Sequence, residues 1–328
     1  MQGILDKCRV RATCYAVAVL AGMLALVLSA GCGTGGKNDP GRMKVAADIV
    51  PMADFCREVG GDMVDVEVMV PPGASPHTYE LTTGQMRFLA EADVLATVGL
   101  GLSPWAEGIF ANTDNPDMIL VVAGEAIPRS LLVRAGETHE GAQDEESAGE
   151  EGQEYDSYDP HVWLDPELAV YMIVAIRDGY MEADPENAEV YRGNAARYIE
   201  ELEELDREIG EELVSVSNRK FVSFHSSWTY FARRYGLEQV GVIEEQPGKE
   251  PSVGEIAALV EGMESQGVKV VFAEPQFNPR AAEAIAEESG GEVVVEILDP
   301  LGDPNHAAAD TYLEMMRQNV AVIMEALK

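Results

Sequence analysis

The chain has 328 residues, which is long enough for about two domains, and its apolar content of 46% excludes disorder throughout. Its formal net charge of −35 at pH 7 excludes a surface that attracts nucleic acid or anionic lipid headgroups. We therefore expect a folded, acidic protein with no nucleic-acid partner.

The N-terminus has the layout of a secretory signal. A short basic stretch precedes an apolar run of 14 residues (15–28), and "LSAGC" follows. The run is shorter than the ~20 residues that span a bilayer, and the small residues mark a cleavage site. We predict a signal peptide over residues 1–31 and, because a cysteine follows the small residues, a lipid on Cys32; an ordinary signal or an uncleaved anchor is the alternative. Residues 32–42 are Gly-rich and are interpreted as a flexible tether.

Residues 43–184 are predicted to form an N-terminal α/β lobe. Valine-rich, strand-like segments ("KVAADIV", "VDVEVMV", "DVLATVGL", "MILVVAG") alternate with helical segments ("MADFCREVGG", "TGQMRFLAEA", "SPWAEGIF"). This alternation indicates a parallel sheet with helices on both faces. Cys56 is the only cysteine after Cys32, so an intramolecular disulfide is excluded, and we interpret it as a small core residue.

Residues 136–159 interrupt the alternation with a strongly acidic segment. It holds ten acidic residues and His139 but no Lys or Arg, and it has almost no aliphatic side chains. Such a composition cannot support a core, so we predict a mobile loop. The loop could collect metal ions weakly, but we favour a solvated loop without a binding role.

The second half of the chain reads as one long helix followed by another α/β lobe. Residues 185–218 carry apolar side chains at spacings of three and four, which predicts a rigid linking helix. Strand and helix patterns then alternate again over residues 219–328. The predicted fold class is α/β: two lobes, each a mostly parallel sheet flanked by helices, bridged by one long rigid helix.

Candidate ligand residues follow predicted strands or loops in both halves of the chain. His77 comes after "VDVEVMV", His225 ends "KFVSFH", Asp299 ends "EVVVEILD", and His161 follows the acidic loop. The carboxyl ends of strands are where α/β folds present ligand groups. Three imidazoles and a carboxylate suit a divalent metal in tetrahedral or nearly tetrahedral geometry. Spacing alone does not show that they converge, and each histidine could instead be solvated or packed in the core.

The motifs "PPGASPHTYE", "YDPHVWLDP", "FVSFHSSWTYFARRYGL" and "EILDPLG" occur in an order that resembles the metal-binding lipoproteins of ABC importers, the cluster A-I group for zinc and manganese. The resemblance covers nearly the whole chain after Cys32. It implies two α/β lobes bridged by a long helix, with metal between them. It also implies that His77, His161, His225 and Asp299 are the metal ligands.

The resemblance and the donor set together favour zinc. Zinc binders of this group have histidine at the third ligand position, as His225 is here, whereas manganese binders often have glutamate. Mn²⁺ prefers oxygen ligands, so Mn²⁺ or iron is the alternative. The loop before the second ligand departs from the group, because it is acidic where zinc binders are often histidine-rich.

Three further residues near these motifs have roles that the sequence leaves open. Glu274 and Arg280 lie in "EPQFNPR" and could orient a ligand imidazole or bridge the lobes; a surface ion pair is the alternative. Glu80 is interpreted as a helix cap rather than a ligand.

The predicted function is extracytoplasmic capture of a divalent metal by a monomeric, lipid-anchored protein that delivers it to a membrane ABC permease. A secreted zinc hydrolase is an alternative, but the chain has neither an HExxH nor a GxSxG motif, and we expect no enzyme activity. An adhesion or structural lipoprotein that binds no metal is the other alternative.

Overall fold

The structure is a computed structural model that describes residues 41–112, 115–136, 157–244, 249, 251–278, 280–305 and 310–328. The predicted signal peptide, the tether up to residue 40 and residues 137–156 of the predicted acidic loop lie outside these ranges. Within the described part of the chain, no helix has both the length and the apolar character needed to cross a bilayer.

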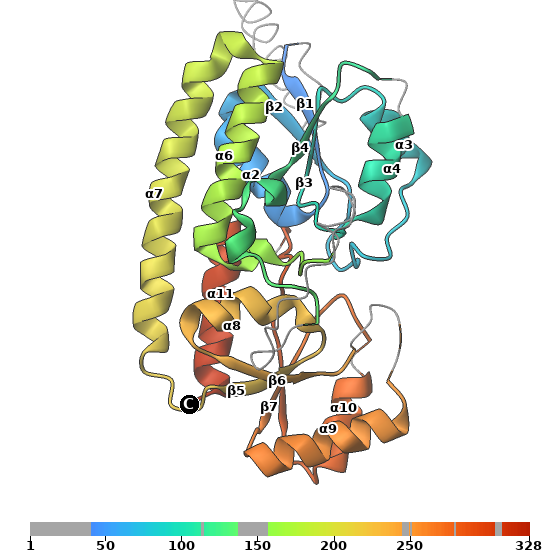
Figure 1. The fold of residues 1–328 in the computed structure, drawn as a ribbon, viewed down its shortest axis with the longest axis vertical. Coiled ribbons are helices and arrows are strands. Elements are labelled where there is room, and N and C mark those ends of the chain that lie inside the picture. The colour runs from blue at the N-terminus through green and yellow to red at the C-terminus, as the bar shows by residue number, and fades with distance from the viewer. Residues whose placement is uncertain are drawn as a thin grey trace, which may run out of the picture. The chain divides into compact units, whose positions relative to one another are not determined.

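A four-stranded parallel sheet forms the first lobe, in the order β2-β1-β3-β4 (Figure 1). Its strands are β1 (Met43–Ala47), β2 (Val64–Val68), β3 (Val94–Thr97) and β4 (Ile119–Val122). Its helices are α2 (Val50–Gly60), α3 (Thr83–Leu89), α4 (Pro104–Asn112) and α6 (Pro166–Ala183). Along β3, Val94 and Ala96 enter one hydrophobic cluster and Leu95 enters another, as the period of two in a strand requires. The sheet is therefore buried on both faces, as predicted.

A second four-stranded parallel sheet follows, in the order β6-β5-β7-β8. Its strands are β5 (Lys220–Ser223), β6 (Glu238–Val242), β7 (Val270–Ala273) and β8 (Val294–Ile297). Its helices are α8 (Thr229–Tyr235), α9 (Val253–Gln266), α10 (Arg280–Glu288) and α11 (Tyr312–Ala326). Along β7, Val270 and Phe272 join the largest core of the molecule, whereas Val271 and Ala273 join a smaller core with residues of α9 and α10.

The predicted linking helix is α7 (Ala188–Leu213), which begins after a 3₁₀ turn at Pro185–Asn187 and is shorter than the predicted span of 185–218. Its 26 residues correspond to a length of ~39 Å. Its buried side chains are those that the spacing of three and four predicted: Tyr191, Ala195, Tyr198, Leu202, Leu205, Ile209 and Leu213. Helix α7 packs on α2, α6 and α11, and in Figure 1 it runs along one side of both sheets.

Two local predictions were incomplete or wrong. Sequence reasoning missed α6, although Asp165 accepts a hydrogen bond from the Glu167 N–H and Pro166 follows it, which is a typical helix start. Glu80 does not cap α3; Thr82 and Gln85 form a reciprocal capping box there, because Thr82 has the hydroxyl and Gln85 lies three residues later.

The two lobes share one core. The largest hydrophobic cluster contains side chains from both sheets together with Trp163, Trp228 and Tyr312. Asp54 of α2 accepts hydrogen bonds from the Tyr198 hydroxyl of α7 and the Tyr312 N–H of α11, at 3.2 and 3.0 Å. The lobes are therefore fixed to each other through α2, α7 and α11.

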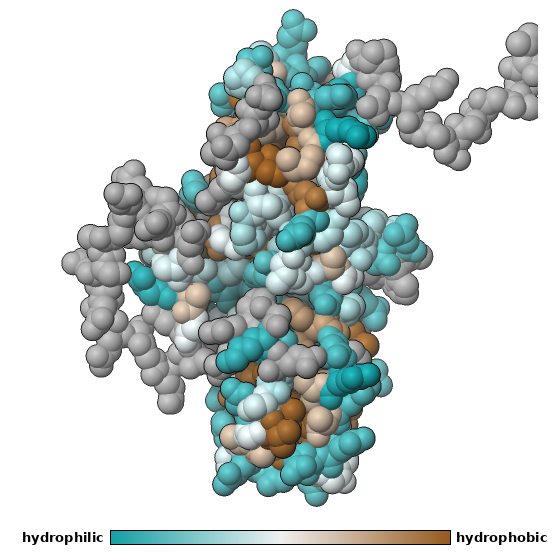
Figure 2. All heavy atoms as spheres, turned by 90° about the vertical axis from the view of Figure 1, so that its right-hand side faces the viewer, coloured by the Kyte–Doolittle hydropathy of each residue, from teal (hydrophilic) through white to brown (hydrophobic). Residues whose placement is uncertain are grey.

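The surface that Figure 2 shows is largely hydrophilic. On this face, hydrophilic residues predominate and hydrophobic ones form separate small areas.

The other 3₁₀ helices of the described residues are short and lie at Gly61–Met63, Ala123–Ala126, Arg129–Leu131, Val162–Leu164 and Ser226–Trp228.

Candidate metal centre

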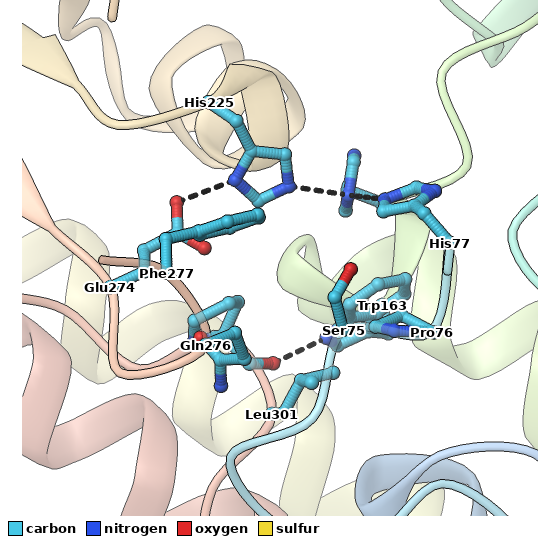
Figure 3. Close-up of a pocket in the computed structure, with 11 residues that line it drawn as sticks. Ser75, Pro76, His77, Trp163, His225, Glu274, Gln276, Phe277 and Leu301 are labelled. Carbon is cyan, nitrogen blue, oxygen red and sulfur yellow. Dashed lines mark hydrogen bonds and ion pairs between the residues drawn. The ribbon is translucent and has the colours of Figure 1, made fainter. Parts of the chain in front are cut away.

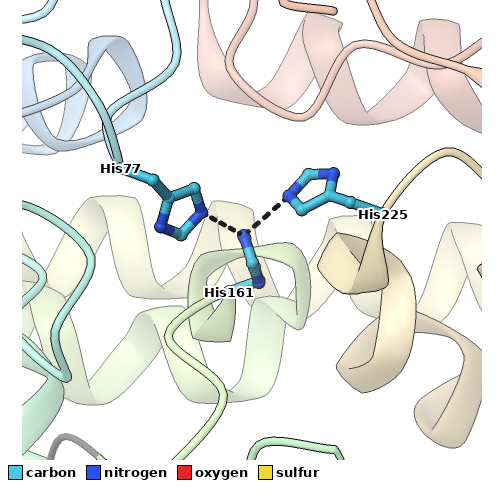
Figure 4. Close-up of side chains that lie close together, drawn as sticks. All are labelled: His77, His161 and His225. Atoms are coloured by element: carbon cyan, nitrogen blue, oxygen red, sulfur yellow. Dashed lines mark hydrogen bonds between the residues drawn. The ribbon is translucent and has the colours of Figure 1, made fainter. Parts of the chain in front are cut away.

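Three histidines from distant parts of the chain converge at one point (Figure 4). The Nε2 atoms of His77 and His161 are 3.4 Å apart, and those of His161 and His225 are 3.1 Å apart. One ring nitrogen from each histidine lies within 4.8 Å of the other two, and no other group of three histidine, cysteine or acidic side chains is this close within the described ranges. The three nitrogens therefore face a common centre that one cation could occupy.

The fold explains why these segments meet. His77 lies in the irregular segment between β2 and α3, and His161 directly precedes the 3₁₀ turn Val162–Leu164. His225 follows the carboxyl end of β5 and begins the 3₁₀ turn Ser226–Trp228. The carboxyl ends of parallel strands lie at one edge of a sheet, so loops from both sheets can reach a shared site.

Buried carboxylates orient two of the three rings. The Nδ1 atom of His161 is 2.8 Å from Oδ1 of Asp159, and Nδ1 of His225 is 2.8 Å from Oε1 of Glu274. A carboxylate accepts a hydrogen bond from Nδ1–H, so the lone pair of the neutral ring is on Nε2 and is directed at the common centre. This tautomer is the one that a metal ligand needs.

Further hydrogen bonds hold these carboxylates in place. The Tyr230 hydroxyl accepts from the Val133 N–H at 3.0 Å and donates to the carbonyl of Asp159 at 2.9 Å. The Ser227 hydroxyl donates to Oε1 of Glu274 at 3.0 Å. Tyr230 is fully packed in the core, so its contact with Asp159 ties the segment that carries His161 to the second lobe.

The histidines differ in electrostatic environment. Burial, reinforced by the neighbouring imidazoles His161 and His225, lowers the pKa of His77 to about 3. Burial also lowers the pKa of His225, but the carboxylates of Glu274, Asp159 and Glu244 together leave that pKa raised above its ordinary value. His77 is therefore neutral at neutral pH, whereas His225 holds its proton more tightly than an ordinary histidine does.

The structure does not bring Asp299, the predicted fourth ligand, into this group. Its Oδ1 accepts hydrogen bonds from Gln276 Nε2 at 2.9 Å and from the Leu301 N–H at 3.0 Å. Its backbone is clamped to Asn319 of α11 by two further hydrogen bonds, Asp299 N to Asn319 Oδ1 and Asn319 Nδ2 to Asp299 O. Asp299 does follow β8, as predicted, but its carboxylate is engaged away from the imidazoles.

Of the two further residues predicted to act near the site, one lies next to a histidine and the other does not. Glu274 lies against the His225 imidazole, whereas Arg280 is an exposed residue at the start of α10 and does not line the site. Cys56 is a free, fully buried thiol whose pKa burial raises to about 12, as expected of a core residue. Sequence reasoning missed Asp159, which it had placed in the mobile acidic loop; the signal was its position two residues before His161.

A small cavity of about 10 Å³ adjoins the histidines (Figure 3). Its walls include Trp163, Phe277 and Leu301 together with three polar residues, Ser75, Glu274 and Gln276. The ring centroid of Phe277 is 4.9 Å from that of His225. The aromatic walls restrict access of water, which strengthens the attraction between a bound cation and its ligands.

Comparisons with known proteins place the chain. It is 29% identical over 310 residues to a zinc-binding lipoprotein, AdcA of Streptococcus pneumoniae, covering 94% of this chain and 60% of AdcA. It is 27% identical over 311 residues to a manganese-binding lipoprotein, MntA of Halalkalibacterium halodurans, covering 93% of this chain and 96% of MntA. The chain thus spans only about 60% of the length of AdcA, whereas it matches nearly all of MntA.

The fold has solved relatives as well. A crystal structure of ZnuA superposes with a TM-score of 0.74 at 36% identity, covering 88% of this chain and all of that one. These neighbours confirm the predicted α/β fold class. The family model described as "Zinc-uptake complex component A periplasmic" matches residues 45–326. The chain therefore belongs to the family of the periplasmic component A of zinc-uptake complexes.

Proposed function

We propose that this protein captures a divalent transition metal, Zn²⁺ in preference to Mn²⁺, outside the cytoplasm and passes it to an ABC permease in the membrane. The observation that carries the proposal is the convergence of His77, His161 and His225, in which Nε2 of His161 lies 3.4 Å from Nε2 of His77 and 3.1 Å from Nε2 of His225. Three imidazoles so close together, in a partly enclosed site, have no evident structural role without a cation between them.

The donor set supports zinc. Imidazole nitrogen is a favoured ligand of Zn²⁺, whereas Mn²⁺ prefers carboxylate, carbonyl and water oxygens. The carboxylates of Asp159 and Glu274 face Nδ1 atoms and so act on the imidazoles rather than on the cation. The relatives include both a zinc-binding and a manganese-binding lipoprotein, so Mn²⁺ is the runner-up.

Binding replaces the water around the cation with the three nitrogens. The ligands have to be deprotonated, so loading releases a proton from His225 when that residue is charged. Asp159 and Glu274 then stabilise the positive charge that the rings share with the metal. Asp299 lies outside this ligand group, and its Oδ1 accepts hydrogen bonds from Gln276 and Leu301.

We favour transport over hydrolysis because the chain has neither an HExxH nor a GxSxG motif and because the two buried carboxylates beside the histidines are hydrogen-bonded to their rings. A catalytic zinc needs an open position and a nearby base for its water. Each of these carboxylates directs one oxygen at an Nδ1 atom, and Oε2 of Glu274 has no hydrogen-bond partner among the described residues. Hydrolysis assays on the zinc-loaded protein, with and without chelator, test this assignment directly.

The predicted signal peptide and lipidated Cys32 support an extracytoplasmic, membrane-anchored location, and the relatives AdcA and MntA are named lipoproteins. The permease would be the macromolecular partner of the loaded, monomeric protein. Radiolabelled palmitate incorporation into wild type and Cys32→Ala separates a lipid anchor from an ordinary signal.

The test of metal capture is elemental analysis of the purified protein, followed by competitive Zn²⁺ and Mn²⁺ titration. His225→Ala should lower zinc affinity by orders of magnitude while the far-UV circular dichroism stays that of the wild type. Zinc binding that is unchanged in this variant would overturn the site assignment. A wild-type protein that binds neither metal would favour the adhesion or structural alternative.

A further inference from the structure

We infer that Gln276 sets the metal specificity of this site, by holding the carboxylate of Asp299 outside the ligand group and by offering its own carbonyl oxygen to a water on the metal. The inference rests on the proposed metal-binding function and concerns the fourth coordination position. It assigns a role to a residue that is neither a ligand nor a partner of a ligand imidazole.

The carboxylate of Asp299 makes two hydrogen bonds to described residues, both through one oxygen. The same oxygen, Oδ1, accepts from Gln276 Nε2 at 2.9 Å and from the Leu301 N–H at 3.0 Å. The Leu301 contact is local and the backbone of Asp299 is clamped to α11 through Asn319. Gln276 is therefore the only side chain of the described residues that hydrogen-bonds this carboxylate.

The second half comes from the other end of the same amide. Oε1 of Gln276 is buried and has no hydrogen-bond partner among the described residues, and the Ser75 hydroxyl and Oε2 of Glu274 are in the same state. All three residues line the small cavity next to the three histidines (Figure 3). A buried acceptor that stays unpaired costs ~1–3 kcal/mol. The cavity, at about 10 Å³, is close to the ~10–15 Å³ that one water needs.

The nitrogen and the oxygen of the Gln276 amide have different hydrogen-bonding roles. Its nitrogen can only donate and its oxygen can only accept, so a Gln276 that donates to Asp299 must find a donor for Oε1. A metal-bound water is such a donor, because the cation makes its protons more acidic. Gln276 thus links a water at the fourth position to Asp299, which acts on the metal through this bridge instead of binding it.

The consequence is a preference for zinc. With water in the fourth position the ligand set is three nitrogens and one neutral oxygen, which suits Zn²⁺. With a carboxylate in that position the set gains an anionic oxygen, which favours Mn²⁺ more than the first set does. Removing the amide should therefore release Asp299 toward the metal and narrow the difference between the two affinities.

The experiment compares wild type, Gln276→Leu, Asp299→Asn and the double variant, each titrated with Zn²⁺ and Mn²⁺ and each loaded with Co²⁺ for its visible absorption spectrum. Gln276→Leu should bind Mn²⁺ about tenfold more tightly, the lower end of the usual effect of outer-sphere partners, with a changed Co²⁺ spectrum. The double variant should lose that gain. Asp299→Asn alone should weaken zinc binding far less than His225→Ala does.

The matched control is Gln239→Leu in β6, because Oε1 of Gln239 is also buried without a partner but the residue does not line the cavity. Mn²⁺ affinity and Co²⁺ spectra that are the same in Gln276→Leu and Gln239→Leu would overturn the inference. So would a loss of zinc affinity in Asp299→Asn as large as in His225→Ala, since Asp299 would then already be a ligand. Either result leaves the proposed function standing, whereas a wild type that binds no metal removes both.

Discussion

Asp159→Asn separates the two contributions that a carboxylate makes to a ligand histidine, its charge and its position. Oδ1 of Asp159 accepts both the backbone N–H of His161, at 2.9 Å, and the ring at Nδ1, at 2.8 Å. Because one oxygen accepts both hydrogen bonds, the amide oxygen of asparagine can replace it. The variant therefore removes the negative charge and keeps the orientation of the imidazole.

The expected loss follows from that geometry. Removing an outer-sphere partner of a metal ligand typically lowers metal affinity by about 10–100-fold. Asparagine removes only the charge, so we expect the lower limit, about tenfold or about 1.4 kcal/mol. Asp159→Ala also frees the ring and should approach the upper limit. The assay is competition for Zn²⁺ against a chromophoric chelator at neutral pH, with thermal unfolding of the metal-free proteins to confirm that each variant folds.

Asp178→Asn is the control, because Asp178 is exposed and its ion pair with Arg177 lies on α6 away from the site. Its zinc affinity should equal that of the wild type. Equal zinc affinities in wild type and Asp159→Asn would refute the electrostatic role, and equal losses in Asp159→Asn and Asp159→Ala would refute the separation of charge from orientation.

Three further predictions concern pH and the acidic loop. Burial raises the pKa of Asp54 to about 6 from 3.8, so folding stability is lost as pH rises through about 6. The amide oxygen in Asp54→Asn can keep both hydrogen bonds made to Oδ2. This variant should therefore remove up to about 3 kcal/mol of the pH dependence of the unfolding free energy, measured by urea unfolding. Because the pKa of His225 is raised, zinc affinity should fall as pH drops through that pKa, and Glu274→Gln should move the fall to lower pH in the same competition assay. Deleting residues 137–156 should leave high-affinity zinc binding nearly unchanged, since His77, His161 and His225 all lie outside the deletion; a large loss would assign the loop a binding role.

The fold class was predictable because the sequence repeats strand and helix patterns whose periods differ. Helix α7 was predictable residue by residue, since its buried side chains recur at spacings of three and four. Helix α6 was missed because its first turn lies next to the motif that contains His161, and the motif was interpreted only as a binding segment. Asp165 and Pro166 nevertheless mark the start of a helix. Local patterns thus locate elements, but a short motif can obscure the element next to it.

The candidate site was predictable only in part. Each histidine could be placed at the end of a strand or loop, but their convergence depends on loops from two sheets, and only the resemblance to a family implied it. Asp159 was assigned to the acidic loop by composition, yet it is buried beside His161, and its carbonyl accepts a hydrogen bond from the Tyr230 hydroxyl, 71 residues away in sequence. The position of Asp299 depends on Gln276 and Asn319, and no pattern in the sequence indicates those contacts.

The contacts around the centre show where a change of shape would cost least. Trp163 Nε1 donates to the carbonyl of Pro300 at 2.7 Å, and the Tyr312 hydroxyl donates to the carbonyl of Trp163 at 2.7 Å, so the segment that carries His161 is tied to the second lobe. By contrast, the backbone–backbone hydrogen bonds that residues 71–81 make to other described residues all lie within the segment itself. A shared core resists rotation of whole lobes, because rotation would break packing throughout that core. A cation can therefore enter and leave at a lower cost in packing and hydrogen bonds if the segment around His77 moves. His161 and His225 would then stay fixed by their carboxylates.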